Sequence, residues 1–98
     1  MSSNYKLNFT KEAKKDLQRL EDYLDELSTA QKRLLVLVKT FQNLKTDWKL
    51  YGYYDRSKNI RVYYIDNWYS IFFIAEESSE TILILAMLAQ SEDLSRLA

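Results

Sequence analysis

The stretch Asn59–Leu88, NIRVYYIDNWYSIFFIAEESSETILILAML, decides the fold of this 98-residue chain. Two polar segments, Asp66–Asn67 and Glu76–Glu80, divide it into three apolar runs, and their residue types favour turns. The second and third runs, Tyr69–Ala75 and Thr81–Leu88, are apolar at almost every position, as is typical of interior strands. The stretch is therefore predicted to form three antiparallel β-strands in a meander.

The residues before this stretch begin with a strand and a helix. Asn4–Phe9 alternates apolar and polar side chains, which predicts a half-buried strand at a sheet edge. Thr10 is a suitable N-cap, and Glu12 follows in the first turn, where the helix dipole favours an acidic side chain. Leucines then recur at steps of three and four, which indicates an amphipathic helix to about Leu27.

A second helix is predicted to follow at once. Ser28 or Thr29 is its expected cap, and its apolar stripe ends at Leu44. The short break between the helices predicts an antiparallel αα-hairpin, and neither helix can bury its stripe without the sheet. The fold class is therefore α+β, with the order β-α-α-β-β-β. Residues 1–98 are expected to form one domain, in which the αα-hairpin packs on one face of a four-stranded, mainly antiparallel sheet.

The segment Lys45–Lys58 has no clear periodicity, so we expect either a loop or a short irregular strand there. Gly52 and the cluster Asp55–Lys58 are turn-forming residues. Six cations and two aspartates give residues 39–61 a net charge of +4, with tyrosines and a tryptophan interleaved. Such a surface is suited to nucleic acid; the alternative is a solvated loop whose tyrosines cover the edge of the core.

Composition excludes several classes of mechanism. Cysteine and histidine are absent, which excludes thiolate nucleophiles, Cys/His zinc sites and a histidine base. A single glycine excludes Gly-rich phosphate loops. We expect no metal, no cofactor, no secretory signal and no membrane span, and hence a cytoplasmic protein. The net charge of zero gives no general case for nucleic-acid binding.

Three segments resemble the RelE/ParE superfamily of bacterial type II toxins. YKLNFTKEAKKDLQRLEDYL, from Tyr5, is similar to the opening strand and first helix of that superfamily. Ile60–Ile74 is similar to its basic hairpin, and Ile84–Leu97 resembles the ending of ParE-like members. The resemblance implies a toxin that is held inactive by an antitoxin. RelE-like members cleave mRNA on the ribosome with basic residues and a C-terminal tyrosine, whereas ParE-like members act on DNA gyrase.

The departures from the superfamily pattern favour the ParE-like branch. Ser70 stands where the hairpin arginine is expected, Ala89–Ser91 has no basic residue, and no tyrosine follows Tyr69. Metal-free RNA cleavage needs fixed cations and a group that moves a proton, and one of the two cationic centres is missing. We therefore expect a protein-binding inhibitor, not an enzyme, whose partners are a protein antitoxin and DNA gyrase or the ribosome. DNA would be contacted only through the antitoxin, and no membrane is involved.

The candidate site residues follow from these readings. The target-binding candidates are Lys58, Arg61 and Arg96, and Arg61 is the best placed because a strand fixes its direction. Antitoxin-binding candidates are Trp48, Trp68 and Leu94. The alternatives are a RelE-like ribonuclease, with Lys49, Arg56 and Arg61 as its candidate catalytic residues, and a degenerate member that binds antitoxin without toxicity. The bare second face of the sheet needs a cover, either from the tail and the Lys45–Lys58 segment or from a partner chain.

Overall fold

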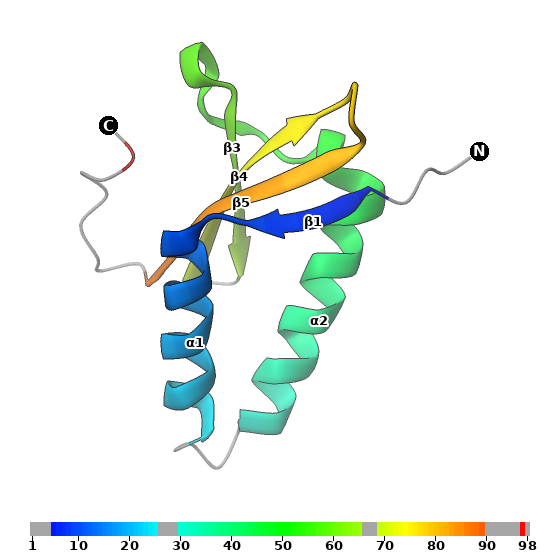
Figure 1. Cartoon of the computed structure of the whole chain (residues 1–98). Helices are drawn as coiled ribbons and strands as arrows, with labels where there is room; N and C mark the ends of the chain where they lie inside the picture. The colour runs from blue at the N-terminus through cyan, green and yellow to red at the C-terminus, as the bar shows by residue number, and fades with distance from the viewer. Residues whose placement is uncertain (1–4, 26–29, 66–68, 90–96, 98) are drawn as a thin grey trace.

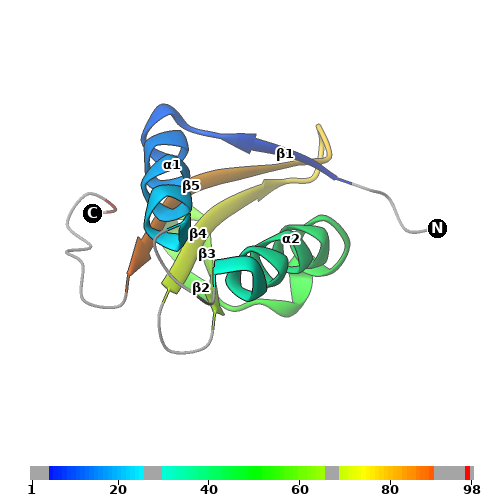
Figure 2. The ribbon, with the colours of Figure 1, turned by 90° about the horizontal axis from the view of Figure 1, so that it is seen from below.

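A computed structural model places two helices on one face of a five-stranded sheet (Figures 1 and 2). It describes residues 5–25, 30–65, 69–89 and 97, with the backbone alone for 23–25 and 30–36. The elements in chain order are β1 (Lys6–Phe9), α1 (Lys11–Asp25), α2 (Ala30–Asp47), the 3-10 turn η1 (Trp48–Leu50), β2 (Tyr53–Asp55), the 3-10 turn η2 (Arg56–Lys58), β3 (Ile60–Ile65), β4 (Tyr69–Glu76) and β5 (Thr81–Ala89).

The sheet has the strand order β1-β5-β4-β3-β2. The predicted meander is confirmed, since β3, β4 and β5 pair antiparallel in succession. β1 then adds to β5 in parallel, with Lys6 opposite Thr81 and Phe9 opposite Ile84. The two strands that are apolar on both faces, β4 and β5, are thus flanked on both sides, and β1 is an edge strand as expected.

The α+β class and the element order are confirmed, but the predicted count of four strands is wrong. The segment read as a loop or an irregular strand contains a three-residue strand, β2, between two 3-10 turns. Three residues are too few for an alternating pattern to stand out, and β2 pairs irregularly with β3. Helix α2 also runs on to Asp47, three residues beyond the end of its apolar stripe. The predicted cap at 28–29 and the tight turn at 66–67 lie outside the described residues.

The main core lies between the helices and the sheet. The predicted N-cap is present, because Thr10 Oγ1 accepts a hydrogen bond from the Ala13 amide at 3.1 Å. Every second residue along the strands points toward the helices and packs against their apolar residues. The buried residues of this core are Ala13, Leu20, Leu37, Leu44, Trp48, Ile65, Tyr69, Ile71, Phe73, Ala75, Ile82, Ile84 and Met87. In the described part of the chain, neither α1 nor α2 has the length and apolar character of a membrane span.

The opposite face of the sheet carries a smaller core, which the chain itself covers in part. Leu97 is buried among Ile60, Val62, Phe72, Ala86 and Leu88. Tyr54 of β2 contacts Phe72 edge-on, with ring centroids 4.9 Å apart. Leu97 and Tyr54 thus cover part of this face from within the chain, and a partner chain over the rest of it stays a prediction.

Helix α1 completes the edge of β5 where β1 ends. The pairing of β5 with β4 shifts at a bulge that leaves Leu85 without a partner. The Leu85 carbonyl accepts a hydrogen bond from Thr10 Oγ1 at 3.2 Å, and the Met87 amide donates to Asp16 Oδ2 at 3.0 Å. Asp16 is buried, at 3% exposure, so α1 is joined to the sheet by polar contacts as well as by its apolar stripe.

Candidate functional site

Five side chains form an alternating series of cations and aromatic rings, which we call the cation–π ladder. Lys49 Nζ lies 5.5 Å from the centre of the Trp48 ring, and Arg61 Cζ lies 5.1 Å from the same ring. Arg61 Cζ is also 4.2 Å from the Tyr53 ring, which has Arg56 Cζ at 4.5 Å. The three candidate catalytic residues are therefore brought together, and two aromatic rings connect them.

Local structure explains this arrangement. Turn η1 places Trp48 and Lys49 beside the start of the sheet, and β2 pairs Tyr53 with Arg61 across the strands. Turn η2 then returns Arg56 toward Tyr53. Asp55 caps η2 by accepting hydrogen bonds from the Ser57 amide and hydroxyl, at 3.1 and 2.7 Å. The hydroxyl hydrogen bond is the main reason why the pKa of Asp55 lies below its ordinary value.

Arg61 is held on several sides. Its Nη1 donates to the Tyr51 carbonyl at 2.6 Å, and its Nη2 donates to the Tyr53 hydroxyl at 3.0 Å. Together with the two ring contacts, these bonds fasten the segment from Trp48 to Tyr53 onto β3. The Arg61 side chain is therefore held against residues 48–53 of its own chain.

The other predicted cations have different surroundings. Lys49 forms an exposed ion pair with Glu77 at 3.5 Å. Arg56 is exposed, and within the described part of the chain its guanidinium has a ring contact but no ion pair. Lys58, in the same turn as Arg56, donates to the carbonyl of Leu97, a residue of the second-face core, at 3.3 Å.

The antitoxin-binding candidates divide into one core residue and two residues outside the description. Trp48 is 6% exposed and packs against Tyr5, with ring centroids 5.7 Å apart. Most of its surface is therefore used inside this chain. Trp68 and Leu94, together with the target-binding candidate Arg96, lie outside the described residues.

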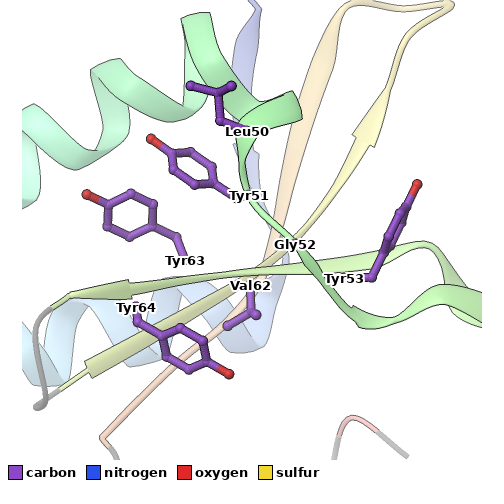
Figure 3. A pocket seen from close by; sticks show the side chains of 7 residues that line it. All are labelled: Leu50, Tyr51, Gly52, Tyr53, Val62, Tyr63 and Tyr64. Carbon is purple, nitrogen blue, oxygen red and sulfur yellow. The ribbon is translucent and has the colours of Figure 1, made fainter.

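A notch opens beside the ladder at the outer edge of β3 (Figure 3). The Tyr51 and Tyr63 rings lie side by side on one side of the strand, at a centroid distance of 4.6 Å, and Val62 and Tyr64 lie on the other. The notch has a volume of about 460 Å³ and is lined by Leu50, Tyr51, Gly52, Tyr53, Val62, Tyr63 and Tyr64. Two of these side chains are unusually exposed for their size, Leu50 at 78% and Tyr64 at 60%.

The notch exists because β2 pairs with only the first part of β3, which continues to Ile65. The Val62 amide donates to the Gly52 carbonyl at 3.1 Å, away from β4, and beyond it β3 pairs with β4 alone. Backbone groups alternate in direction along a strand, so the amide and carbonyl of Tyr64 also face away from β4. In the described residues, no strand or loop pairs with them.

The side chains at the notch are suited to binding a partner rather than to catalysis. Burial raises the pKa of Tyr51, and Tyr63 and Asp47 add to this effect, so the Tyr51 phenol stays protonated at neutral pH. Ser70, where a second cation is expected, is buried at 5% exposure. The described residues contain no group of three acidic, histidine or cysteine side chains that would hold a metal ion.

Sequence reasoning identified the three cations but missed the notch. Its residues come from η1, the start of β2 and β3, and only their tyrosine content was visible in the sequence. Tyr63 packs against the main core, whereas Tyr64 is exposed.

Comparison with protein-family models gives a match over most of the chain. Residues 7–94 match the family described as the ParE toxin of type II toxin–antitoxin system, parDE. Among curated protein sequences, no significant relative is found.

Three solved structures share the fold. A chain of the chromosomal ParDE system from P. aeruginosa is 21% identical, with a TM-score of 0.67 over 88% of this chain and 96% of that one. A chain of the RelBE2 toxin–antitoxin complex from Mycobacterium tuberculosis is 18% identical, with a TM-score of 0.59 over 92% and 95%. The isolated E. coli RelE toxin is 12% identical, with a TM-score of 0.59 over 95% and 92%. At these identities the likeness concerns the fold alone.

Proposed function

This chain belongs to the ParE toxin family of type II toxin–antitoxin systems, and we propose that it arrests growth by binding DNA gyrase rather than by cleaving RNA. A protein antitoxin neutralises it, in keeping with the toxin–antitoxin systems named for two of its structural neighbours. Any contact with DNA runs through the antitoxin.

The observation that carries this proposal is the use of Arg61 inside the chain. A metal-free ribonuclease must aim fixed cations at the scissile phosphate and must also move a proton. The guanidinium of Arg61 instead donates to Tyr51 and Tyr53 and is flanked by two rings. Ser70 supplies no charge that could replace Arg61 at the phosphate. The pKa of Tyr51 is raised, so its phenol does not replace the missing group that moves a proton.

A second candidate function is ribosome-dependent RNA cleavage of the RelE type. One observation favours it, namely that Lys49, Arg56 and Arg61 are gathered in one ladder. Against it stand the net charge of zero and the ion pair that Lys49 forms with Glu77, because ribosome binding depends on neutralising phosphates.

Expression of the chain alone in a bacterium separates these functions. Growth, mRNA integrity and the SOS response are measured, and the purified protein is added to a gyrase supercoiling assay. The proposal predicts growth arrest with intact mRNA, an SOS response and inhibited supercoiling. Ile84→Asp, which places a charge at a fully buried core position, serves as the unfolded control.

Each other outcome has a definite meaning. Messenger RNA cut at the ribosome would establish the RelE-like function and overturn the gyrase proposal. If the bacterium grows normally while it expresses the chain, and circular dichroism shows that the protein is folded, the chain is a degenerate member that has kept only antitoxin binding.

A further inference from the structure

We propose that Leu50 and the notch beside it form the surface through which this chain contacts its protein target, with Leu50 as the apolar anchor. The partner rests on the proposed function, in which the target is DNA gyrase. The matching surface of the target is expected to be apolar at its centre and acidic around it. Three features of the chain support this surface, which are the exposure of Leu50, the rigid segment that holds it and the charge around it.

Exposed apolar side chains gather at the notch. In the described part of the chain, the large apolar side chains that are exposed are Val38, Leu50, Tyr54 and Tyr64. Leu50, at 78% exposure, and Tyr64, at 60%, both line the notch (Figure 3). Tyr54 instead packs on Phe72, and Val38 is not part of the lining. Single exposed apolar residues are ordinary, but two that share one hollow of about 460 Å³ indicate a binding site.

The segment that carries Leu50 is held in place on both sides. Trp48, two residues earlier, is 6% exposed. Tyr51, the next residue, accepts a hydrogen bond from Arg61 at its carbonyl, at 2.6 Å, and packs its ring on Tyr63 at a centroid distance of 4.6 Å. An exposed leucine between two fixed aromatic residues loses little backbone freedom when a partner binds it, so little affinity is lost to ordering.

A preformed surface suits the target. Under the proposed function the free toxin is the active species, so it must present its target-binding surface without help from a second protein. The notch meets this condition, because its lining comes entirely from residues 50–53 and 62–64 of one chain. The lining also includes Tyr51, Tyr53, Tyr63 and Tyr64, and tyrosine is enriched at the centres of protein interfaces.

Charge narrows the choice of partner. Residues 39–61 carry a net charge of +4 in a protein whose total is zero. Lys49 directly precedes Leu50, and the Arg56 guanidinium lies 4.5 Å from the ring of Tyr53, a residue of the lining. Acidic side chains around an apolar centre on the target would therefore favour docking at this surface. A second copy of this chain would bring the same cations face to face, which disfavours self-association.

A nucleic acid fits the same surface less well. Lys49 is paired with Glu77 at 3.5 Å, and Glu76 and Glu80 are close to Glu77 in the chain. A phosphate backbone at this position would meet carboxylates and lose the neutralisation on which its binding depends. Leu50 also offers no ring on which a base could stack, whereas an apolar pocket of a protein would remove it from water.

The experiment measures the concentration of purified full-length chain that halves DNA supercoiling by gyrase. Leu50→Ala removes the anchor, and Val38→Ala is the matched change at an exposed position on α2. Arg56→Glu reverses a charge beside the notch, and Lys14→Glu makes the same change on α1. We expect Leu50→Ala and Arg56→Glu each to raise the half-inhibitory concentration about tenfold or more, and both controls to leave it unchanged. Thermal unfolding should show similar stability in all four variants, because every substituted side chain is exposed.

The opposite results overturn the inference. Wild-type potency in Leu50→Ala or in Arg56→Glu, or an equal loss in the matched controls, would show that the target is contacted elsewhere. A dimer in sedimentation experiments that Leu50→Ala dissociates would assign the surface to a second copy. Binding of a single-stranded RNA oligonucleotide that Leu50→Ala abolishes would assign it to nucleic acid.

The inference and the proposed function fail in distinguishable ways. If the wild-type chain does not inhibit supercoiling, the proposed function falls and this inference falls with it. If the wild-type chain inhibits supercoiling and Leu50→Ala inhibits it equally well, the gyrase proposal stands and only the role given to Leu50 and the notch is refuted.

Discussion

At the scale of single residues, Arg61 has the sequence context of a binding residue but a structural role in the fold. It is interleaved with aromatic residues in the sequence, as in many nucleic-acid surfaces. In the fold, its two hydrogen bonds and two ring contacts join β3 to the segment that precedes β2. Its loss should therefore affect stability before it affects any contact with a partner.

We expect Arg61→Met to lower the free energy of unfolding by about 2 kcal/mol, because charge-assisted hydrogen bonds and cation–π contacts are removed together. Arg61→Lys should lose less, since one donor can remain. Urea denaturation followed by tryptophan fluorescence measures both. Arg56→Met, on the same ladder but exposed, is the matched control, with an expected change of about 0.5 kcal/mol or less. Equal effects at the two positions would show that Arg61 is not the fastening residue.

Asp55 offers a prediction about pH. The Ser57 hydroxyl is the largest cause of its lowered pKa, so Ser57→Ala should move the pKa of Asp55 back toward its ordinary value. Because the folded-state pKa is the lower one, the stabilisation is complete above the ordinary pKa. It is lost as the pH falls through the folded-state value. NMR titration of the Asp55 carboxyl carbon measures the shift, and an unchanged pKa in Ser57→Ala would contradict the assignment.

At the scale of elements, the contact between α1 and β5 depends on a buried carboxylate. Asp16 accepts from the Met87 amide beyond the last residue that β1 covers. We expect Asp16→Ala to cost about 2 kcal/mol, since it leaves a buried amide without its acceptor, and Asp16→Asn to cost less because one oxygen remains. Asp22→Ala, on the exposed side of the same helix, is the control. Thermal or urea unfolding provides the comparison, and a similar loss in Asp22→Ala would refute the role given to Asp16.

The elements with a repeating pattern were predictable from the sequence. Apolar runs separated by polar turns predicted the meander β3–β5, and the N-cap at Thr10 predicted the start of α1. The bulge at Leu85 was hidden, because a run that is apolar on both faces looks the same with or without a register shift. Strand β2 was hidden by its length.

For the candidate site, the sequence predicted which residue types gather in one region but not how they are arranged. The sequence placed cations and aromatics in one region, and the ladder is their actual arrangement. The notch depends on where β2 leaves β3, which is a property of pairing between strands and has no local signature. Asp16 could have been suspected, since it follows Ala13 by three residues on the buried side of α1.

At the scale of the whole molecule, the helices cover one face of the sheet, and Leu97 covers part of the other. Leu97 is 7% exposed in the smaller core. We expect Leu97→Ala to lower the free energy of unfolding by about 2 kcal/mol through lost burial. Leu50→Ala, at a position that is 78% exposed, should change it by about 0.5 kcal/mol or less. Chemical denaturation distinguishes the two, and a negligible effect of Leu97→Ala would mean that the second core is stable without it.

The parallel pairing of β1 with β5 has a consequence for how the protein is made. Among the described strands, β1 leaves the ribosome first, yet β5, its neighbour in the sheet, is translated last. β5 is also the strand that carries the polar contacts of α1 and separates β1 from β4. The nascent chain therefore holds an unpartnered strand and a half-exposed helix until β5 has been translated, and closure of the sheet must be a long-range step that waits for this strand. An antitoxin that is already present meets the chain while the toxin is still assembling its sheet.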